Sequence, residues 1–214
     1  MSHERIIGLY EDTASQWDAV RRDLTPHERP HLDAFADALP AKASVLDIGC
    51  GSGVPVARHL LARGLAVTGI DSSASLIDLC RERFPEREWR VADMRGLDLG
   101  RRFHGIIAWY SFFHLSPDDQ RAMFPIFARH AAPGAILTFT SGPLEGVRIG
   151  EWQGEPLYHA SLSQQEYRAL LAANRFEVLN FTIGEPVDVG PTVWLARRFP
   201  PDQINPASGL DGSA

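Results

Sequence analysis

One short segment, residues 45–53, constrains the fold of this chain more than any other. It reads Val-Leu-Asp-Ile-Gly-Cys-Gly-Ser-Gly, an apolar strand that runs into a turn with glycine at every second position. A turn without side chains lets the backbone approach a ligand closely, and the apolar run at 54–61 predicts a helix whose N-terminus supplies free N–H donors. The segment therefore predicts an α/β fold with a cofactor at this turn.

Two further strand patterns end in an acid. Residues 66–71 are β-rich and end in Asp71, about 20 residues after the turn, as a βαβ unit requires. Residues 88–94 form a third pattern, which contains Asp93. Each acid could instead cap the helix that follows it. With Asp47 from the first strand, three acids lie in step along one sheet edge, and a shared ligand explains this arrangement better. A carboxylate at the position of Asp71 can accept hydrogen bonds from ribose hydroxyls.

The spacing of the glycines separates two families of cofactor-binding enzymes. The dinucleotide fingerprint G-x-G-x-x-G would place its third glycine at position 54, which is valine here. The spacing G-x-G-x-G after an acid instead resembles the first motif of the class I S-adenosylmethionine (SAM)-dependent methyltransferases. A tight strand-to-helix connection without a ligand could also use such glycines. The resemblance extends over residues 6–199, and the segments 111–115, 157–162 and 192–196 are similar to a group of small bacterial members whose substrates are mostly unassigned.

The resemblance implies a Rossmann-like three-layer sandwich around a seven-stranded, mostly parallel sheet with one antiparallel strand. Residues 1–199 would form a single SAM-binding domain, with N-terminal lid helices at 1–40, a substrate-side insertion at 142–162 and a mobile tail at 200–214. The remaining patterns agree with this fold: strands at 105–110, 135–140, 176–183 and 192–196, the last two antiparallel, and helices at 75–84 and 117–131.

The resemblance also assigns residues to SAM. Asp93 would bind the adenine amino group, Met94 would pack on the adenine ring, and an aromatic side chain near the N-terminus would cover the cofactor. A helix over residues 9–18 would place Tyr10 and Trp17 on one face, although simple packing against the sheet would produce the same pattern. The expected cofactor-binding residues are Tyr10, Trp17, Asp47, Gly49, Cys50, Gly51, Asp71, Ser72, Asp93, Met94 and Trp109.

The methyl acceptor is expected beyond the fourth and fifth strands, where open parallel sheets bind substrates. Aromatic side chains with polar tips follow both strands and suit a small, partly planar acceptor. The catalytic candidates are His159 and His114 as bases and Tyr110 as the group that orients the acceptor, with Tyr158 in the same cavity. A lone histidine is more often a hydrogen-bonded structural residue than a base, so that reading stays open for each. An amine or activated phenol acceptor needs no strong base.

The predicted function is SAM-dependent methyl transfer to the nitrogen or oxygen of a small molecule. Two alternatives stay open: a non-catalytic SAM-binding protein, and a nicotinamide-dependent oxidoreductase, which is disfavoured by the misplaced glycine and by a single lysine, Lys42. The net charge of −6 argues against nucleic acid as a partner, so the pair Arg21-Arg22 is expected on a solvated face. No apolar run in the sequence approaches the ~20 residues of a membrane helix, and we expect a cytoplasmic monomer or homodimer.

One apparent metal motif is discounted. Residues 27–31 read His-Glu-Arg-Pro-His and match H-E-x-x-H, which needs both histidines on one helix face. Pro30 disfavours the helical conformation at the preceding residue, so we expect the helix to start near Pro30 with His27 outside it. Cys50 and Cys80 are the only cysteines, too few for a disulfide framework or a cysteine zinc site. No metal is therefore expected.

Overall fold

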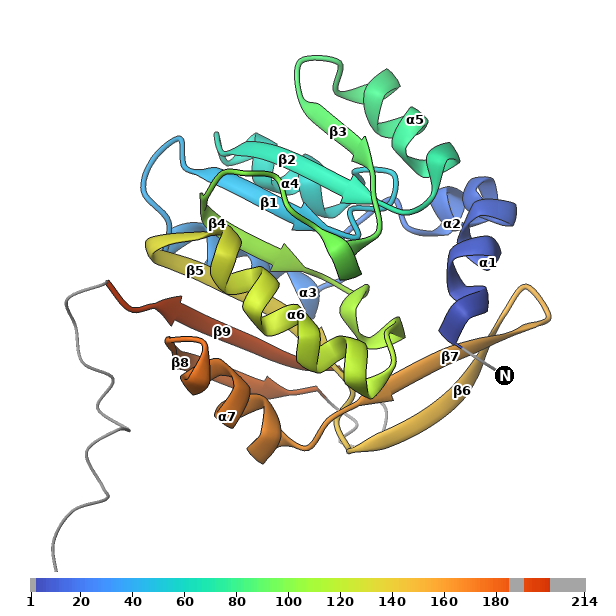
Figure 1. Cartoon of the computed structure of the whole chain (residues 1–214). Coiled ribbons are helices and arrows are strands. Elements are labelled where there is room, and N and C mark those ends of the chain that lie inside the picture. Colours follow the sequence, from blue (N-terminus) through green and yellow to red (C-terminus); the bar gives the residue numbers. More distant parts are fainter. Residues whose placement is uncertain (1–2, 185–190, 201–214) are drawn as a thin grey trace, which may run out of the picture.

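The computed structural model of the chain describes residues 3–184 and 191–200 and has an α/β architecture (Figure 1). Seven strands form one sheet in the order β3-β2-β1-β4-β5-β9-β8. Their bounds are β1 Ser44–Ile48, β2 Ala66–Asp71, β3 Glu88–Val91, β4 Phe103–Ala108, β5 Ala131–Ser141, β8 Phe176–Ile183 and β9 Thr192–Arg198. β9 pairs antiparallel with both β5 and β8, while the other pairs are parallel. The predicted seven-stranded sheet with one antiparallel strand is confirmed.

Helices cover both faces of the sheet. On one face lie α3 Glu28–Asp37, α4 Val56–Ala62 and α5 Ala74–Arg83, and on the other lie α6 Pro117–His130 and α7 Gln164–Ala173. The buried apolar side chains accordingly form two clusters, one that contains Leu60 and Ile77 and one that contains Phe124 and Tyr167. Strands buried on both faces read as continuous apolar runs, which is the pattern that the sequence shows. The three-layer sandwich is confirmed.

Serine side chains set the starts of the helices that follow β2, β4 and the insertion. The hydroxyls of Ser73, Ser116 and Ser163 each accept a hydrogen bond from the backbone N–H three residues later. Such capping satisfies a donor that has no partner inside the helix. The helices expected at 75–84 and 117–131 are found within one residue of these bounds.

The N-terminal segment forms two short helices, α1 Ile6–Asp12 and α2 Ala14–Val20, after a 3-10 turn η1 at His3–Arg5. The single helix expected over 9–18 is therefore wrong. The break falls at Thr13, whose hydroxyl donates to the Leu9 carbonyl at 2.6 Å, a side-chain bond that competes with the helical backbone. Tyr10 and Trp17 remain neighbours across the break, with ring centroids 5.1 Å apart.

The insertion expected at 142–162 is a β-hairpin. β6 Gly146–Trp152 and β7 Glu155–Ser161 pair antiparallel and form a separate two-stranded sheet. Figure 1 shows that the hairpin extends away from the main sheet and passes beside α1. The limits expected for the domain stay a prediction, and the expected tail lies outside the described residues from position 201 on.

The H-E-x-x-H segment folds as Pro30 indicated. α3 begins at Glu28, and His27 lies just outside it at the N-cap. Within residues 3–184 and 191–200, no three His, Cys, Asp or Glu side chains are grouped closely enough to hold a metal ion. In the same part of the chain, none of the helices combines the length and apolar character that crossing a bilayer requires.

Candidate functional site

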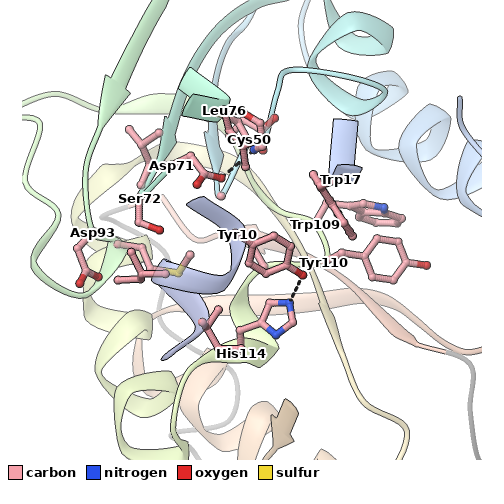
Figure 2. Close-up of a pocket in the computed structure, with 18 of the residues that line it drawn as sticks. Tyr10, Trp17, Cys50, Asp71, Ser72, Leu76, Asp93, Trp109, Tyr110 and His114 are labelled. Atoms are coloured by element: carbon pink, nitrogen blue, oxygen red, sulfur yellow. Dashed lines mark hydrogen bonds between the residues drawn. The ribbon is translucent and has the colours of Figure 1, made fainter. Parts of the chain in front are cut away.

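The carboxyl ends of β1, β2 and β4 open into a cavity, called here the sheet-end cavity (Figure 2). Every residue expected to bind the cofactor lines it: Tyr10, Trp17, Asp47, Gly49, Cys50, Gly51, Asp71, Ser72, Asp93, Met94 and Trp109. The residues at or after strand ends converge because parallel strands end at the same edge of the sheet, and α1 and α2 add Tyr10 and Trp17. The structure therefore brings the predicted set together, and the role of each residue stays a prediction.

The glycine turn combines an unusual backbone with close packing. Gly49, Gly51 and Gly53 have φ values of 77°, 55° and 75°, where side chains are disfavoured. A Cβ at Gly49 would lie 2.3 Å from the Cβ of Ser111, whereas a Cβ at Gly51 meets nothing closer than Trp17 Nε1 at 3.5 Å. A side chain at Gly51 would therefore project into the space between the turn and Trp17, which both line the cavity.

Asp71 ends β2 and holds the glycine turn. Its Oδ2 accepts the Gly51 N–H at 2.8 Å, and its Oδ1 accepts the Ser73 N–H at 2.9 Å. Burial raises the pKa of Asp71, and these backbone donors oppose the increase. Each carboxylate oxygen has more than one acceptor site, so Asp71 can bind ligand hydroxyls while it holds the turn.

Asp47 has a buried oxygen that lacks a partner. The residue is 1% exposed, and its Oδ2 has no hydrogen bond from any described residue. Burial, together with the charge of Asp71, raises the pKa of Asp47 to about 8. Because buried polar atoms are almost always hydrogen-bonded, a cationic or donor group in the cavity would supply the missing partner. The cavity thus fits a positively charged ligand such as SAM.

Asp93 has the capping role that the sequence left open and also lines the cavity. It caps the short 3-10 helix η2 Met94–Gly96, where Oδ1 accepts the Arg95 N–H at 2.9 Å. The Arg95 guanidinium binds the same carboxylate, and these hydrogen bonds hold the pKa of Asp93 below its usual value. Asp93 is therefore a charged acceptor at the far end of the cavity in Figure 2.

A second cavity of about 570 Å³, called here the hairpin cavity, is lined by β6, β7 and the ends of β4 and β5. This volume lies within the roughly 300–1,000 Å³ typical of small-molecule sites. The two cavities share a wall of five side chains: Tyr10, Trp17, Arg21, Tyr110 and His114. Ligands in the two cavities would meet at this shared wall.

The three expected catalytic residues line the hairpin cavity, but Tyr158 does not. Tyr110, at a φ of 52°, and His114 line both cavities, and His159 lines the hairpin cavity. Neighbouring residues of a strand point to opposite faces, so the orientation of His159 directs Tyr158 away, to within 5.9 Å of the His3 ring. The expectation that Tyr158 lines the same cavity is wrong.

The two histidines have different surroundings. His114 Nδ1 lies 2.8 Å from the Tyr158 carbonyl, and Nε2 lies 3.0 Å from the Tyr10 hydroxyl (Figure 2). A carbonyl can only accept, so Nδ1 carries the proton and Nε2 accepts from Tyr10. Burial lowers the pKa of His114 to about 3. Burial also lowers the pKa of His159, although a hydrogen bond to the Leu157 backbone acts in the opposite direction and raises it. Both imidazoles are neutral at pH 7.

Sequence reasoning missed the role of Arg21 and Glu28. Arg21 was expected on a solvated face, yet its side chain is 18% exposed and donates to both oxygens of Glu28, at 3.0 and 2.7 Å. Glu28 also accepts from Trp109 Nε1 at 3.0 Å and from the Thr25 N–H at 2.9 Å. Burial alone would raise the pKa of Glu28, but these hydrogen bonds hold it below its usual value. No periodicity or motif marks this pair, because it joins two elements across a loop.

Comparison with known proteins identifies a methyltransferase domain. A family described as "Methyltransferase domain" matches residues 45–134. One relative is a dTDP-4-amino-2,3,4,6-tetradeoxy-D-glucose N,N-dimethyltransferase from Saccharopolyspora spinosa, which is 29% identical over 187 residues. The match covers 83% of this chain and 75% of that relative. Residues 45–134 thus form a methyltransferase domain, and the chain is a SAM-dependent methyltransferase. A second relative is a dTDP-3-amino-3,6-dideoxy-alpha-D-glucopyranose N,N-dimethyltransferase from Streptomyces fradiae, which is 34% identical over 100 residues. The matched residues cover 46% of this chain and 39% of that relative.

Solved structures agree with the fold of this methyltransferase. A SAM-bound amino pentose methyltransferase from Micromonospora echinaspora superposes with a TM-score of 0.63 at 20% identity, covering 80% of this chain and 90% of that one. A magnesium protoporphyrin IX methyltransferase from Synechocystis has a TM-score of 0.71 at 16% identity and covers 92% and 98%. The cofactor is SAM, and the nicotinamide oxidoreductase and non-catalytic alternatives are set aside. Membership of the narrower bacterial group stays a prediction.

Proposed function

We propose that this methyltransferase transfers the methyl group of SAM to a nitrogen or oxygen atom of a small molecule in the hairpin cavity. The observation that carries the proposal is the shared wall, at which a ligand in one cavity can contact a ligand in the other. Bound SAM supplies a methyl group that is already electrophilic. The protein then has to align the acceptor and exclude water, and side chains that line both cavities can serve both purposes.

The sheet-end cavity would hold SAM through the residues that the sequence singled out. Asp71 would accept the ribose hydroxyls, and Asp93 would accept the adenine amino group while Met94 packs on the ring. The unpartnered oxygen of Asp47 would face a positively charged group of the cofactor. Gly51 leaves the space that the ligand needs beside Trp17. These assignments account for every charged group that ends a strand in this cavity.

The hairpin cavity favours an acceptor whose reacting group enters uncharged. Of the described residues that line it, Glu28 is the one with a carboxylate, and Arg21 and Trp109 already bind both of its oxygens. An ammonium group would find no further counter-charge there, so desolvation favours the neutral, nucleophilic amine. The matched amino-sugar N,N-dimethyltransferases support an amine as the first candidate acceptor.

The polar residues of the hairpin cavity divide into a base and positioning groups. His159 is neutral and faces the cavity, so it can accept the proton that the acceptor releases. His114 has a partner on each ring nitrogen and therefore positions Tyr10. Burial raises the pKa of Tyr110 to about 12, so its phenol stays protonated and can donate a hydrogen bond to the acceptor.

Turnover with defined acceptors tests the proposed function. The protein is incubated with SAM and one compound from each class: a nucleotide-linked amino sugar, a simple aliphatic amine, a phenol and a carboxylic acid. We expect S-adenosylhomocysteine (SAH) to form with an amine or hydroxyl compound, together with a product one methyl group heavier by mass spectrometry. Methylation of nucleic acid or protein alone, or SAH binding without turnover of any class, would contradict the proposal.

A further inference from the structure

The helices that carry Tyr10 and Trp17 depend on outside contacts for their position. α1 and α2 have seven residues each, and neither has a side-chain hydrogen bond at its N-cap. Helices of this length are unstable in water on their own. Two groups of contacts hold them to α5: the carboxylate of Glu11 accepts from Ser73 and Ser75, and Asp18 forms a bidentate pair with Arg83. These contacts lie along one side of the helix pair.

The hairpin supplies a contact at the junction between the two helices. Trp152 ends β6, and its Nε1–H donates to the hydroxyl of Thr13 at 2.8 Å. Its ring lies edge-on to Trp17, with centroids 5.4 Å apart, and Trp17 in turn contacts Tyr10. Trp152 itself lines neither the sheet-end cavity nor the hairpin cavity. An effect of Trp152 on a ligand would therefore pass through Thr13 and Trp17.

We propose that Trp152 is a positioning residue for SAM, which acts from the hairpin to hold the α1–α2 junction over the sheet-end cavity. The Thr13 hydroxyl donates to Leu9 and accepts from Trp152, so both of its hydrogen-bonding roles are used. Loss of the Trp152 N–H would free the junction and let Trp17 leave the cavity wall, while His114 still holds Tyr10. The hairpin, which lines the second cavity, thereby controls how long the cofactor stays bound. This inference does not depend on the identity of the acceptor.

The affinity of the full chain for SAH, measured by calorimetry, tests the proposal. Trp152→Phe keeps an aromatic ring against Trp17 but removes the donor. We expect the Kd for SAH to rise about fivefold, the effect of one neutral hydrogen bond, mainly through faster dissociation. Thr13→Val removes the acceptor and should produce the same rise. Thr13→Ser keeps the hydroxyl and should retain the wild-type affinity.

Controls separate this role from a general loss of stability. Val147→Ala changes an exposed side chain on the same strand, outside both cavities, and should leave the Kd unchanged. The double variant of Trp152→Phe and Thr13→Val should bind SAH no more weakly than Thr13→Val alone, because that variant has already lost the Trp152–Thr13 bond. Thermal unfolding checks that each variant is folded. If the Trp152→Phe variant does not fold, the Kd of the Thr13→Val variant alone tests the proposal. A Kd within about twofold of wild type, or additive losses in the double variant, would overturn the proposal.

Discussion

The sheet-end cavity and the hairpin cavity are built in different ways. The first is formed mainly by strand ends and turns of one sheet, and Asp47, Gly51 and Asp71 lie close together in the sequence. The second joins segments far apart: the Arg21 and Glu28 pair, the loop after β4, and the hairpin that carries His159. A local motif can therefore specify the cofactor, whereas the acceptor is selected by elements that must first dock on one another.

The largest expected effect tests whether the sheet-end cavity binds the cofactor. Gly51→Val places a branched side chain at a φ of 55° and into the space between the turn and Trp17. We expect the affinity for SAH to fall by about a thousandfold or more, which corresponds to ~4 kcal/mol. Circular dichroism should show a folded protein. The control is Gly64→Val, which imposes similar backbone strain at a φ of 79° in open space and should bind SAH normally.

A smaller effect is expected on the other side of the shared wall. His159→Ala removes the group that accepts a proton in the hairpin cavity, so kcat should fall about a hundredfold while the Kd for SAH stays unchanged. His104→Ala changes an exposed histidine that contacts Ser44 and should leave both quantities at wild-type values. An unchanged kcat in the His159 variant would show that the acceptor needs no base from this cavity.

The smallest effect of the three concerns pH. Asp47 has a pKa of about 8, and a cation binds to its charged form, so the affinity for SAM should weaken as the pH falls from 8 to 7, by up to about tenfold. Asp47→Asn should remove this dependence. The variant should also stabilise the ligand-free protein at pH 8, because an acid whose pKa is raised on folding destabilises the fold increasingly from about pH 4 upward. A gain of ~2 kcal/mol would raise Tm by roughly 4 to 8 °C. Calorimetry that shows a flat affinity in the wild type would contradict this role.

The sequence predicted the parts of the site that follow from single elements. Apolar strands, helix caps and glycine positions are local features, so the seven-stranded sheet was found as predicted, and all of the residues expected at the cofactor line the sheet-end cavity. Asp93 shows the limit of this reasoning. Its position after β3 was predicted, but its binding to Arg95 depends on which rotamers the folded chain allows.

The rest depended on contacts between elements that no local pattern encodes. The strand β6 is exposed along most of its length and contains Gly146 and Gly150, so it lacked the sustained alternation that marks a half-buried strand. Without that hairpin, the orientations of Tyr158 and His159 could not be separated. The break at Thr13 follows from a side-chain bond that competes with a helix, and the pairing of Arg21 with Glu28 follows from how α2 and α3 pack.

The central claim is that the cofactor lies in the sheet-end cavity with its reacting end at the shared wall. A crystal structure of the protein with SAH tests this claim most directly. The account predicts the ribose against Asp71 and the sulfur facing Tyr110 and His114, with the Tyr110 side chain no more than about 10 Å away, so that an acceptor between them can reach both. SAH in the hairpin cavity, or a sulfur farther than this from Tyr110, would contradict the account.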